Sequence, residues 1–456
     1  MSHPRPQSEL LPSEAAALSA ATRATHDRAR AREAVGIGPA PLRVLFASTG
    51  GTVGGAERVL LDLMSSMRRR SPAWALRLLS PAEGQLLTDA QALGVATRVE
   101  RFPASVARLG DSPVGRAGGR IGWALRLAAG LFRATPPSVA YLWRLRRALR
   151  DEAPDVVHTN GLKMHLLCAL AAPRAASVVW HVHDYVTTRP VMARALRVCA
   201  RRVAAVVANS ESVAEDVRRL LGARVPVHTV YNGVDLARFA PVGPSADLDA
   251  LAGLPPAPPG VVRVGLVATF ATWKGHDVFL RALAALPSDT PVRGYVVGGA
   301  LYETARSQRD VDALRHLANE LGVAGRVGFT GYVRDTATAM RALDVVVHAS
   351  THPEPFGLVI AEGMACGRPV IVSDAGGARE IVATCACAIT HPPGDSAALA
   401  NAIARLAASR AMREELGAAG RDAAVRRFDR DRVAGQVAHV YASVRLGAAG
   451  VARAAT

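Results

Sequence analysis

The feature that most constrains the fold of this chain is an alternation of short apolar stretches with helical stretches, which occurs twice. Apolar stretches typical of buried strands lie at 42–48, 74–79, 95–99, 155–158, 177–182, 203–208 and 227–231. A segment rich in Pro, Gly and Ala at 241–259 interrupts the pattern, which resumes at 261–268, 293–297, 327–330, 343–348 and 369–372. Because strands separated by helices form parallel sheets, the sequence predicts an α/β chain with two doubly wound, Rossmann-like domains.

The predicted domains divide the chain at the Pro-rich segment. We expect a flexible tail at 1–40, a first domain at 41–240 and a second at 241–426, with a further helix at about 427–445. Doubly wound sheets bind ligands outside the carboxyl ends of their strands. Two such domains that face each other would therefore share one cleft.

Length and composition favour a globular protein, because 456 residues can bury two cores and half of them are hydrophobic. The sequence has no apolar run of 18 residues and no apolar signal-peptide core near its start, so we expect it to stay in the cytoplasm. Five cysteines without a paired Cys-x-x-Cys spacing are expected to be reduced thiols.

The formal net charge of +17 is concentrated in the first half. Residues 1–240 carry 33 Lys and Arg against 18 Asp and Glu, whereas the rest carries 22 against 20. A basic domain suits an anionic partner, which makes an inner-membrane surface a candidate partner and the location peripheral on that membrane. A generally basic surface is the alternative. We expect no nucleic-acid partner, because the sequence contains no recognition motif.

The stretch 352–369, His-Pro-Glu-Pro-Phe-Gly-Leu-Val-Ile-Ala-Glu-Gly-Met-Ala-Cys-Gly-Arg-Pro, places two carboxylates around the start of a helix. Its prolines put Glu354 before the helix and Glu362 inside it. The amides of Gly357, Leu358 and Val359 would stabilise a diphosphate at the helix N-terminus. Ionised carboxylates accept hydrogen bonds from sugar hydroxyls. The stretch predicts a nucleotide-sugar site, and the alternative is an ordinary surface helix.

Pro-Glu-Pro-Phe-Gly, Glu362 and Cys-Gly-Arg-Pro-Val together resemble the motif of retaining glycosyltransferases of family four, which have the GT-B fold. The resemblance spans about residues 42–445. It implies two Rossmann-like domains facing across a cleft, with the C-terminal helix crossing back onto the first domain. It also implies that Glu354 contacts the donor sugar and Glu362 the ribose, and that the enzyme is independent of metals and other cofactors.

Trp273-Lys-Gly-His-Asp277 follows the first strand of the second domain and is similar to the same family. Lys274 is therefore expected to bind the diphosphate and to act in catalysis, although a solvated lysine is the alternative. The family usually carries an Arg five residues earlier, where this chain has Thr269. Arg306 and Arg379 are candidate replacements for that cation.

Gly50-Gly51-Thr-Val-Gly54-Gly55-Ala56-Glu57 follows the first strand, and its Gly-Gly-Ala-Glu part resembles the family's N-terminal donor loop. The stretch lacks the spaced Gly-x-Gly-x-x-Gly pattern. An ordinary glycine-rich turn is the alternative. The expected donor-binding residues are Gly54, Gly55, Thr269, Lys274, Val333, Glu354, Phe356, Gly357, Leu358, Val359 and Glu362.

Polar side chains also follow strand ends of the first domain. His183 is the candidate catalytic group near the reacting sugar, with a satisfied core histidine as the alternative. Asn160, Lys163 and Asp184 are the candidate acceptor-binding residues. Residues 116–150 combine Arg with aromatic residues in two helical pieces separated by Pro136 and Pro137, and suit either a membrane surface or core packing.

These patterns predict a retaining glycosyltransferase that moves a sugar from a nucleoside diphosphate to an acceptor hydroxyl. A lipid-linked or saccharide acceptor in cell-surface glycan or glycolipid assembly is expected. The alternatives are another GT-B enzyme, such as a nucleotide-sugar epimerase or a phosphorylase, and a non-catalytic sugar-nucleotide-binding protein. We expect no metal, because the Asp-x-Asp pairs do not lie at strand ends.

Overall fold

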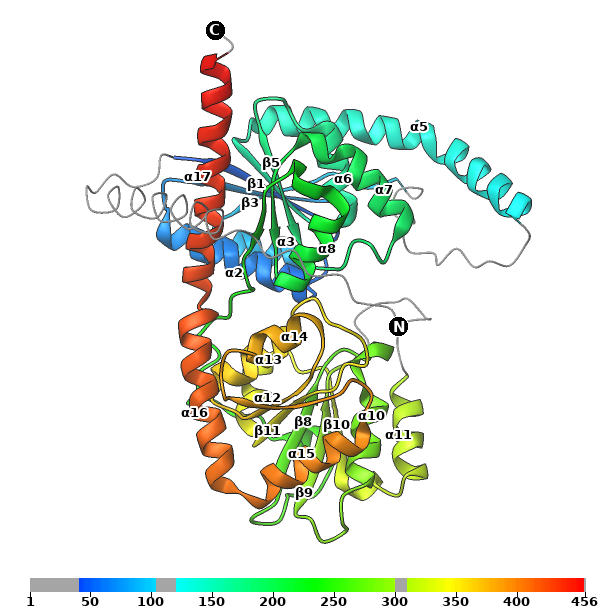
Figure 1. Cartoon of the computed structure of the whole chain (residues 1–456), viewed down its shortest axis with the longest axis vertical. Helices are drawn as coiled ribbons and strands as arrows, with labels where there is room; N and C mark the ends of the chain where they lie inside the picture. Colours follow the sequence, from blue (N-terminus) through cyan, green and yellow to red (C-terminus); the bar gives the residue numbers. More distant parts are fainter. Residues whose placement is uncertain (1–40, 104–119, 300–309, 455–456) are drawn as a thin grey trace, which may run out of the picture.

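A computed structural model describes residues 41–103, 120–299 and 310–454. The predicted tail at 1–40 and Arg306 lie outside these ranges. Two parallel sheets form the centres of two bodies, one above the other in Figure 1. The strand orders are β3-β2-β1-β4-β5-β6-β7 and β10-β9-β8-β11-β12-β13, and every pairing is parallel. The strand order reverses between β1 and β4 in one sheet and between β8 and β11 in the other. This reversal confirms the doubly wound α/β prediction.

The first sheet contains β1 (Arg43–Ser48), β2 (Ala75–Ser80), β3 (Ala96–Val99), β4 (Val156–Asn160), β5 (Ser177–Val182), β6 (Val203–Ala208) and β7 (Val227–Thr229). The second contains β8 (Val262–Val267), β9 (Val292–Val297), β10 (Val327–Gly331), β11 (Val345–His348), β12 (Val370–Ser373) and β13 (Ala388–His391). Twelve of these strands overlap predicted stretches. Edge strand β13 was not predicted, because its four residues are only partly apolar and two of them are half-buried.

Helices cover both faces of each sheet (Figure 1). Those of the upper body are α2 (Gly55–Arg70), α3 (Gln85–Ala92), α5 (Arg120–Glu152), α6 (Leu162–Ala171), α7 (Pro190–Cys199) and α8 (Glu211–Leu221). Those that follow are α9 (Leu248–Ala252), α10 (His276–Ala284), α11 (Val311–Glu320), α12 (Thr336–Ala342), α13 (Leu358–Ala365), α14 (Gly376–Val382), α15 (Ser396–Ala408), α16 (Arg410–Arg427) and α17 (Arg430–Ala454).

Helix α5 corrects one expectation. It continues through Pro136 and Pro137, where we predicted two separate pieces. A proline removes its own amide hydrogen bond and disfavours helix at the preceding residue, but the remaining turns can still bond on either side. The C-terminal turns of α5 are held by burial of Tyr141 and Leu145 in the core beside α6.

The C-terminal helices connect the two bodies along one side of the molecule (Figure 1). Helix α16 packs against α13, and α17 continues upward to pack against α2 and the first sheet. Val433, Val437 and Tyr441 of α17 share a buried core with residues of α2 and β1. The chain therefore ends on the domain in which its first strand lies.

Candidate functional site

The carboxyl edge of the second sheet holds the first part of the site. Strands β8 and β11 are neighbours at the point where the strand order reverses, which is where doubly wound sheets bind ligands. Thr269 and Lys274 follow β8, and Ser350 and Glu354 follow β11. The fold therefore brings together residues that lie 80 positions apart in the sequence.

Glu354 is the most constrained carboxylate of this edge. Its side chain is 7% exposed and forms an ion pair with Lys274 through Oε1, which also accepts a hydrogen bond from Ser350 Oγ. His348 Nε2 lies 3.3 Å from Oε2. Burial alone would raise the pKa of Glu354, but the nearby Lys274 ammonium and His348 hold it well below its usual value. Glu354 is therefore an ionised acceptor fixed in one orientation.

The local backbone explains why Glu354 lies at the start of α13. Gly377 N donates to the Glu354 carbonyl over 2.7 Å, so the loop pairs with the start of α14. Gly357 then precedes α13 with φ of 98°, a left-handed conformation that favours glycine. The amides of Gly357, Leu358 and Val359 lie at the helix N-terminus, where no intrahelical acceptor exists. This is the predicted anion-binding geometry.

Glu362 lies one turn into α13 and is only partly exposed. Burial raises its pKa to about 8, while Arg238 and Arg58 lower it and Asp62 raises it. Arg58 and Asp62 belong to α2, so charges of the first domain influence the pKa of Glu362. Burial therefore favours the protonated form of Glu362, whereas its sequence context predicts an ionised carboxylate.

The other predicted donor residues divide into two groups. Thr269 and Val333 are half-buried in loops at this edge. Phe356, in contrast, is 3% exposed and packs between Tyr231 and Phe428, with ring centroids 6.2 and 5.8 Å away. Phe356 thus has the environment of a core residue.

Arg379 is the described candidate for the cation that is missing at Thr269. That side chain is 67% exposed and forms an ion pair with Asp374 over 3.3 Å. Lys274 is therefore the residue that the structure places beside both Glu354 and the loop carrying Thr269.

The glycine-rich turn begins α2, as predicted. Gly54 precedes the helix, and its amide donates to Glu57 Oε2 over 3.1 Å. A Cβ on Gly55 would meet no atom within 4 Å, so its backbone is accessible to a ligand. A Cβ on Gly51 would lie 2.2 Å from the Glu83 carbonyl oxygen. Gly51 thus serves chain packing, while Gly54 and Gly55 remain donor-loop candidates.

The carboxyl edge of the first sheet holds the predicted acceptor residues. Asn160 ends β4 and is buried, and His183 follows β5 with both ring nitrogens buried. Burial lowers the pKa of His183 to about 4, so the ring is neutral. Asp184 pairs with Arg189 over 2.6 Å, and Lys163 lies in the first turn of α6. Neither His183 nitrogen has a hydrogen-bond partner among the described residues, unlike those of a satisfied core histidine.

Several residues join the two edges and were missed by the sequence analysis. Tyr185 Oη donates to the Glu354 carbonyl over 3.2 Å. Glu380 of α14 accepts hydrogen bonds from the amides of Glu211 and Ser212 over 2.7 Å each, at the N-terminus of α8. A carboxylate there is favoured by the helix dipole. Such contacts carry no local sequence signal, because their partners are about 170 positions apart.

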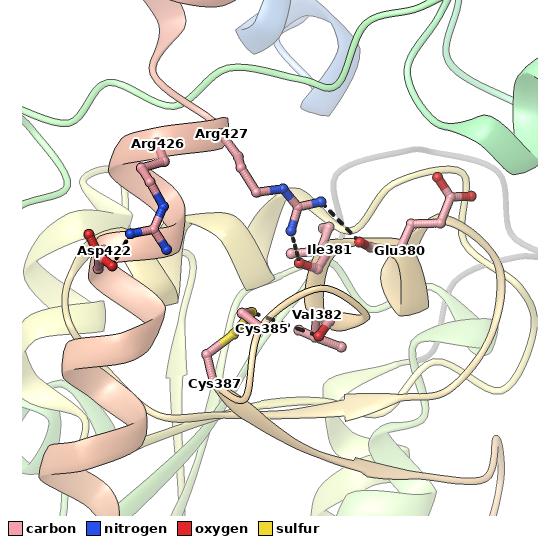
Figure 2. Close-up of a disulfide and its surroundings, with 8 residues drawn as sticks. All are labelled: Glu380, Ile381, Val382, Cys385, Cys387, Asp422, Arg426 and Arg427. Atoms are coloured by element: carbon pink, nitrogen blue, oxygen red, sulfur yellow. Dashed lines mark hydrogen bonds and ion pairs between the residues drawn. A yellow bond between two sulfur atoms is a disulfide. The ribbon is translucent and has the colours of Figure 1, made fainter. Parts of the chain in front are cut away.

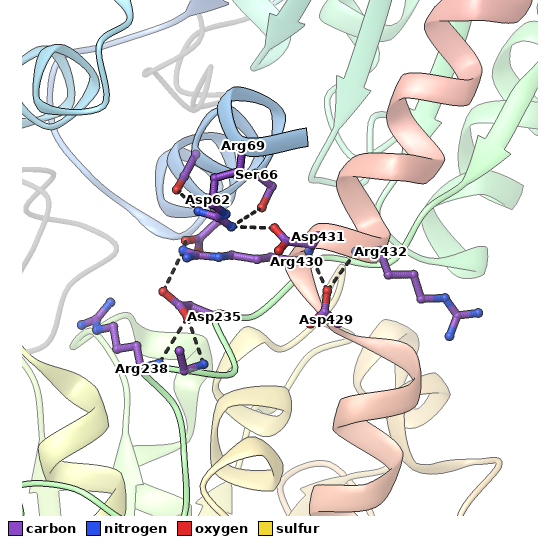
Figure 3. Close-up of polar contacts among 11 residues, drawn as sticks. Asp62, Ser66, Arg69, Asp235, Arg238, Asp429, Arg430, Asp431 and Arg432 are labelled. Carbon is purple, nitrogen blue, oxygen red and sulfur yellow. Dashed lines mark hydrogen bonds and ion pairs between the residues drawn. The ribbon is translucent and has the colours of Figure 1, made fainter. Parts of the chain in front are cut away.

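A second junction lies beside α17. Arg430 Nη1 lies 2.9 Å from Asp62 of α2 and 2.7 Å from Asp235, between these two carboxylates in Figure 3. Asp431 pairs with Arg69 over 2.6 Å. The first turn of α17 therefore ties α2 to the segment connecting the two sheets.

His348 and Ser350 were also missed, although a signal was available. Both follow the rule used for Asn160, because they are polar residues at the end of a buried strand. The His-Ala-Ser sequence before Glu354 could have been recognised in the same way.

Cysteine pairing corrects another expectation. Cys385 and Cys387 form a disulfide after α14, shown in Figure 2, whereas we predicted five thiols. Cys168, Cys199 and Cys366 are free and buried, as predicted. The two sulfur atoms meet because the turn after α14 folds back, a feature that spacing alone does not reveal. Beside it, Arg427 donates to the carbonyls of Glu380 and Ile381 at the end of α14.

Two features are absent from residues 41–103, 120–299 and 310–454. No group of three or more His, Cys, Asp or Glu suited to a metal ion was found there. No helix in those ranges is both long and apolar enough to cross a membrane. The expected absence of a metal stays a prediction.

Two family models match the chain. Residues 257–423 match "Glycosyl transferases group 1" and residues 53–238 match "Glycosyltransferase Family 4". The first match covers the second sheet, and the second match covers the strands of the first sheet except β1. Together they confirm the family resemblance.

Named relatives were found over part of the chain. D-inositol 3-phosphate glycosyltransferase of Xylanimonas cellulosilytica is 39% identical over 249 residues, 52% of this chain and 56% of that protein. Phosphatidyl-myo-inositol mannosyltransferase of Mycobacterium leprae is 36% identical over 174 residues, 38% of this chain and 43% of that protein. The chain thus spans about half the length of these relatives.

Among solved structures, the Anabaena protein HepE in complex with UDP and glucose matches with a TM-score of 0.70 and 26% identity. The match covers 88% of this chain and 100% of that one. Sucrose-phosphate synthase from Thermosynechococcus elongatus has the same fold, with a TM-score of 0.69 and 21% identity. The predicted GT-B architecture is thereby confirmed.

Proposed function

This chain belongs to the group 1, family 4 glycosyltransferases of the GT-B fold, and from this premise we propose that it transfers a sugar from a nucleoside diphosphate to an acceptor hydroxyl with retention of configuration. The observation that carries the proposal is the ion pair between half-buried Lys274 and buried Glu354 at the N-terminus of α13. It combines a cation, an ionised acceptor and helix amides at one point.

Each of these groups has a role in the proposed reaction. Glu354 accepts hydrogen bonds from hydroxyls of the transferred sugar, and Glu362 from the ribose. Lys274 and the α13 amides stabilise the diphosphate as negative charge develops on it. Lys274 must then exchange Glu354 for the diphosphate, while Ser350 and His348 keep Glu354 in place.

The proposed chemistry is a same-face attack guided by the leaving phosphate. The acceptor hydroxyl attacks the anomeric carbon as the bond to the diphosphate oxygen breaks, and the hydroxyl proton passes to that oxygen. We assign to His183, neutral at physiological pH, the contact with the sugar from the first domain. In this mechanism the positive charge comes from Lys274 and from the partial charges of the helix amides. No metal is required.

The substrates are proposed from the relatives. HepE was crystallised with UDP-glucose, which makes UDP-glucose the first donor to test. The named relatives act on inositol phosphate or phosphatidyl-myo-inositol. We therefore propose a lipid-linked or saccharide acceptor, with a role in glycolipid or cell-surface glycan assembly.

A lipid-linked acceptor would be met at a membrane surface. Trp143 of α5 is 68% exposed, with the exposed Arg144 and Arg147 beside it, while Tyr141 and Leu145 pack into the core. This arrangement presents an aromatic ring and positive charge outward. We propose peripheral binding to anionic lipid, which sedimentation with phosphatidylglycerol vesicles tests, with phosphatidylcholine vesicles as the control.

In the decisive experiment, the full chain is incubated with UDP-, GDP- or ADP-sugars and with a panel of saccharide and phosphatidylinositol acceptors. Product mass and release of nucleoside diphosphate are measured. Acceptor-dependent release with an axial glycosidic bond from an axial donor supports the proposal. Donor turnover without acceptor indicates an epimerase, and tight donor binding without any product indicates a non-catalytic protein, which Thr269 would then explain.

A further inference from the structure

Buried polar atoms without a protein partner gather at the carboxyl edge of the first sheet. Within the described ranges they include Ser48 Oγ, both amide atoms of Asn160, His181 Nε2, both ring nitrogens of His183 and Asn209 Oδ1. We call these five residues the polar edge. A buried polar group left unpaired costs about 1–3 kcal/mol, so apolar side chains would serve a core better. The cluster therefore indicates a ligand.

Strand register places Ser48, Asn160 and His181 of the polar edge in one row. Ser48 of β1 pairs with Asn160 of β4, and Asn160 pairs with His181 of β5. His181 pairs with Val207, two residues before Asn209. Paired residues of a parallel sheet point to the same face. Strands β1 and β4 are also where the strand order reverses, the position at which doubly wound sheets bind ligands.

A hydrogen-bonded chain reaches the polar edge from the C-terminal helix. Tyr441 Oη of α17 lies 2.7 Å from His158 Nδ1, and His158 Nε2 lies 3.2 Å from His181 Nδ1. All three side chains are buried. The His181 ring in turn contacts the His183 ring, with centroids 4.0 Å apart. Tyr441, 283 positions from His158 in the sequence, thus supports His181 of the polar edge through His158.

The donor and acceptor in each hydrogen bond between Tyr441, His158 and His181 follow from the protonation states of these side chains. Burial raises the pKa of Tyr441 well above its usual value and lowers that of His158 to about 3 and that of His181 well below 6.5, so all three stay neutral. The phenolic hydrogen has no other acceptor among the described residues, so Tyr441 donates to His158 Nδ1. His158 Nε2–H then donates to His181 Nδ1, which places the single N–H hydrogen of the His181 ring on Nε2.

We propose that the polar edge binds hydroxyl groups of an uncharged sugar or cyclitol ring, and that Tyr441 fixes His181 Nε2–H as a donor in this site. The inference rests on the proposed function and specifies its acceptor side. The five residues offer neutral donors and acceptors only, which suits hydroxyls. The nearby Asp184 is already paired with Arg189. Tyr441 acts as a positioning residue through His158.

The test uses nitrogen NMR of the full chain labelled with ¹⁵N-histidine. We expect His181 to carry its hydrogen on Nε2 in the wild type, and Tyr441→Phe to release this preference. Tyr295→Phe is the matched control, because Tyr295 is also buried and hydrogen-bonded, to Asp249 in the second domain. A tautomer that Tyr441→Phe leaves unchanged would overturn the positioning role.

Adding three compounds separately identifies which ligand the polar edge binds. Myo-inositol and methyl α-glucoside, each added alone, should shift the His181 signals if the acceptor binds there, whereas a shift with UDP-glucose alone assigns the edge to the transferred sugar. Either response supports hydroxyl binding, and no response to any of the three overturns it. Ser48→Ala should weaken the response about tenfold without lowering Tm, since Ser48 Oγ has no partner to lose.

These outcomes are separable from failure of the proposed function. Wild-type release of UDP from UDP-glucose in the presence of acceptor tests the function without reference to His181. For an active acceptor, Tyr441→Phe should raise the acceptor KM about tenfold while the UDP-glucose KM stays unchanged. An equal change in both constants would indicate a structural role for Tyr441.

Discussion

The carboxyl edges of the two sheets occupy equivalent positions in the same fold but differ in charge. The edge of the second sheet holds an ion pair between half-buried Lys274 and buried Glu354, with Glu362 nearby. At the edge of the first sheet the buried side chains are neutral, and they include His181 and His183, whose pKa values burial lowers. One scaffold therefore supports two kinds of recognition.

The difference indicates how the proposed reaction is divided. A diphosphate carries charge that must be matched, and an ion pair can exchange one anion for another. A hydroxylated ring needs donors and acceptors in fixed directions but no charge, and a charged group there would have to be desolvated.

The largest effect is expected for Lys274→Met, which removes the cation and keeps most of the apolar stem. Transfer rate should fall about 10²–10³-fold, because the departing diphosphate loses its counter-charge. Stability should also fall by about 3 kcal/mol, because Glu354 is left as a buried unpaired carboxylate. Initial rates of UDP release and thermal unfolding measure the two effects.

A double variant separates these effects. Adding Glu354→Gln to Lys274→Met should restore Tm, since the unpaired charge is gone, but not activity. Arg315→Met is the matched control, because Arg315 is an exposed cation on α11. Nearly normal turnover by Lys274→Met would contradict the proposed role of the lysine.

Glu362→Ala is expected to remove the rise in Tm that UDP produces. A ligand at 100 times its Kd adds roughly 2.7 kcal/mol to stability, and loss of the ribose contact should cancel most of this. Differential scanning fluorimetry with UDP measures it, with Glu414→Ala on exposed α16 as the control. A full response in Glu362→Ala would exclude the ribose assignment.

The raised pKa of Glu362 predicts a pH dependence of stability. Between its usual value of 4.5 and about 8, the folded chain holds a proton that the unfolded chain has released. The free energy of unfolding contributed by this group therefore falls as pH rises through that window and is constant above it.

Glu362→Gln removes this titration. As the pH rises from 5 to 8, the free energy of unfolding of the variant should therefore increase by roughly 2 kcal/mol relative to that of the wild type. This value is smaller than the full pKa shift would give, because the side chain is partly exposed. Urea unfolding at both pH values measures the difference. An identical pH profile for the two proteins would show that burial does not control Glu362.

The smallest effect is expected for Tyr185→Phe, which tests the contact between the edges. The variant loses the hydrogen bond to the Glu354 carbonyl and the 3.1 Å contact with Ser212, worth about 1 kcal/mol together. We expect a small loss of stability and a several-fold rise in donor KM. Tyr332→Phe, at an exposed tyrosine, is the control, and equal effects in both variants would argue against the contact.

Local sequence was sufficient for much of the fold and part of the site. Continuous apolar runs mark buried parallel strands, so β1, β5 and β6 could be predicted closely, whereas the half-buried edge strand β13 could not. Glu354, Lys274 and the start of α13 were found because their chemistry depends on nearby Pro and Gly residues. The disulfide between Cys385 and Cys387 was missed, because spacing does not report how a turn folds.

By itself, the sequence determined two doubly wound domains, a helix that begins beside Glu354 and a lysine after the first strand of the second domain, since these depend on interactions within a few residues. Tertiary structure decided that Lys274 pairs with Glu354, that Glu362 is largely protonated and that Tyr441 reaches His158. Pairing and burial depend on which distant segments meet, and burial sets the cost of charge. The neutrality of one edge and the ionic pair at the other are therefore products of packing.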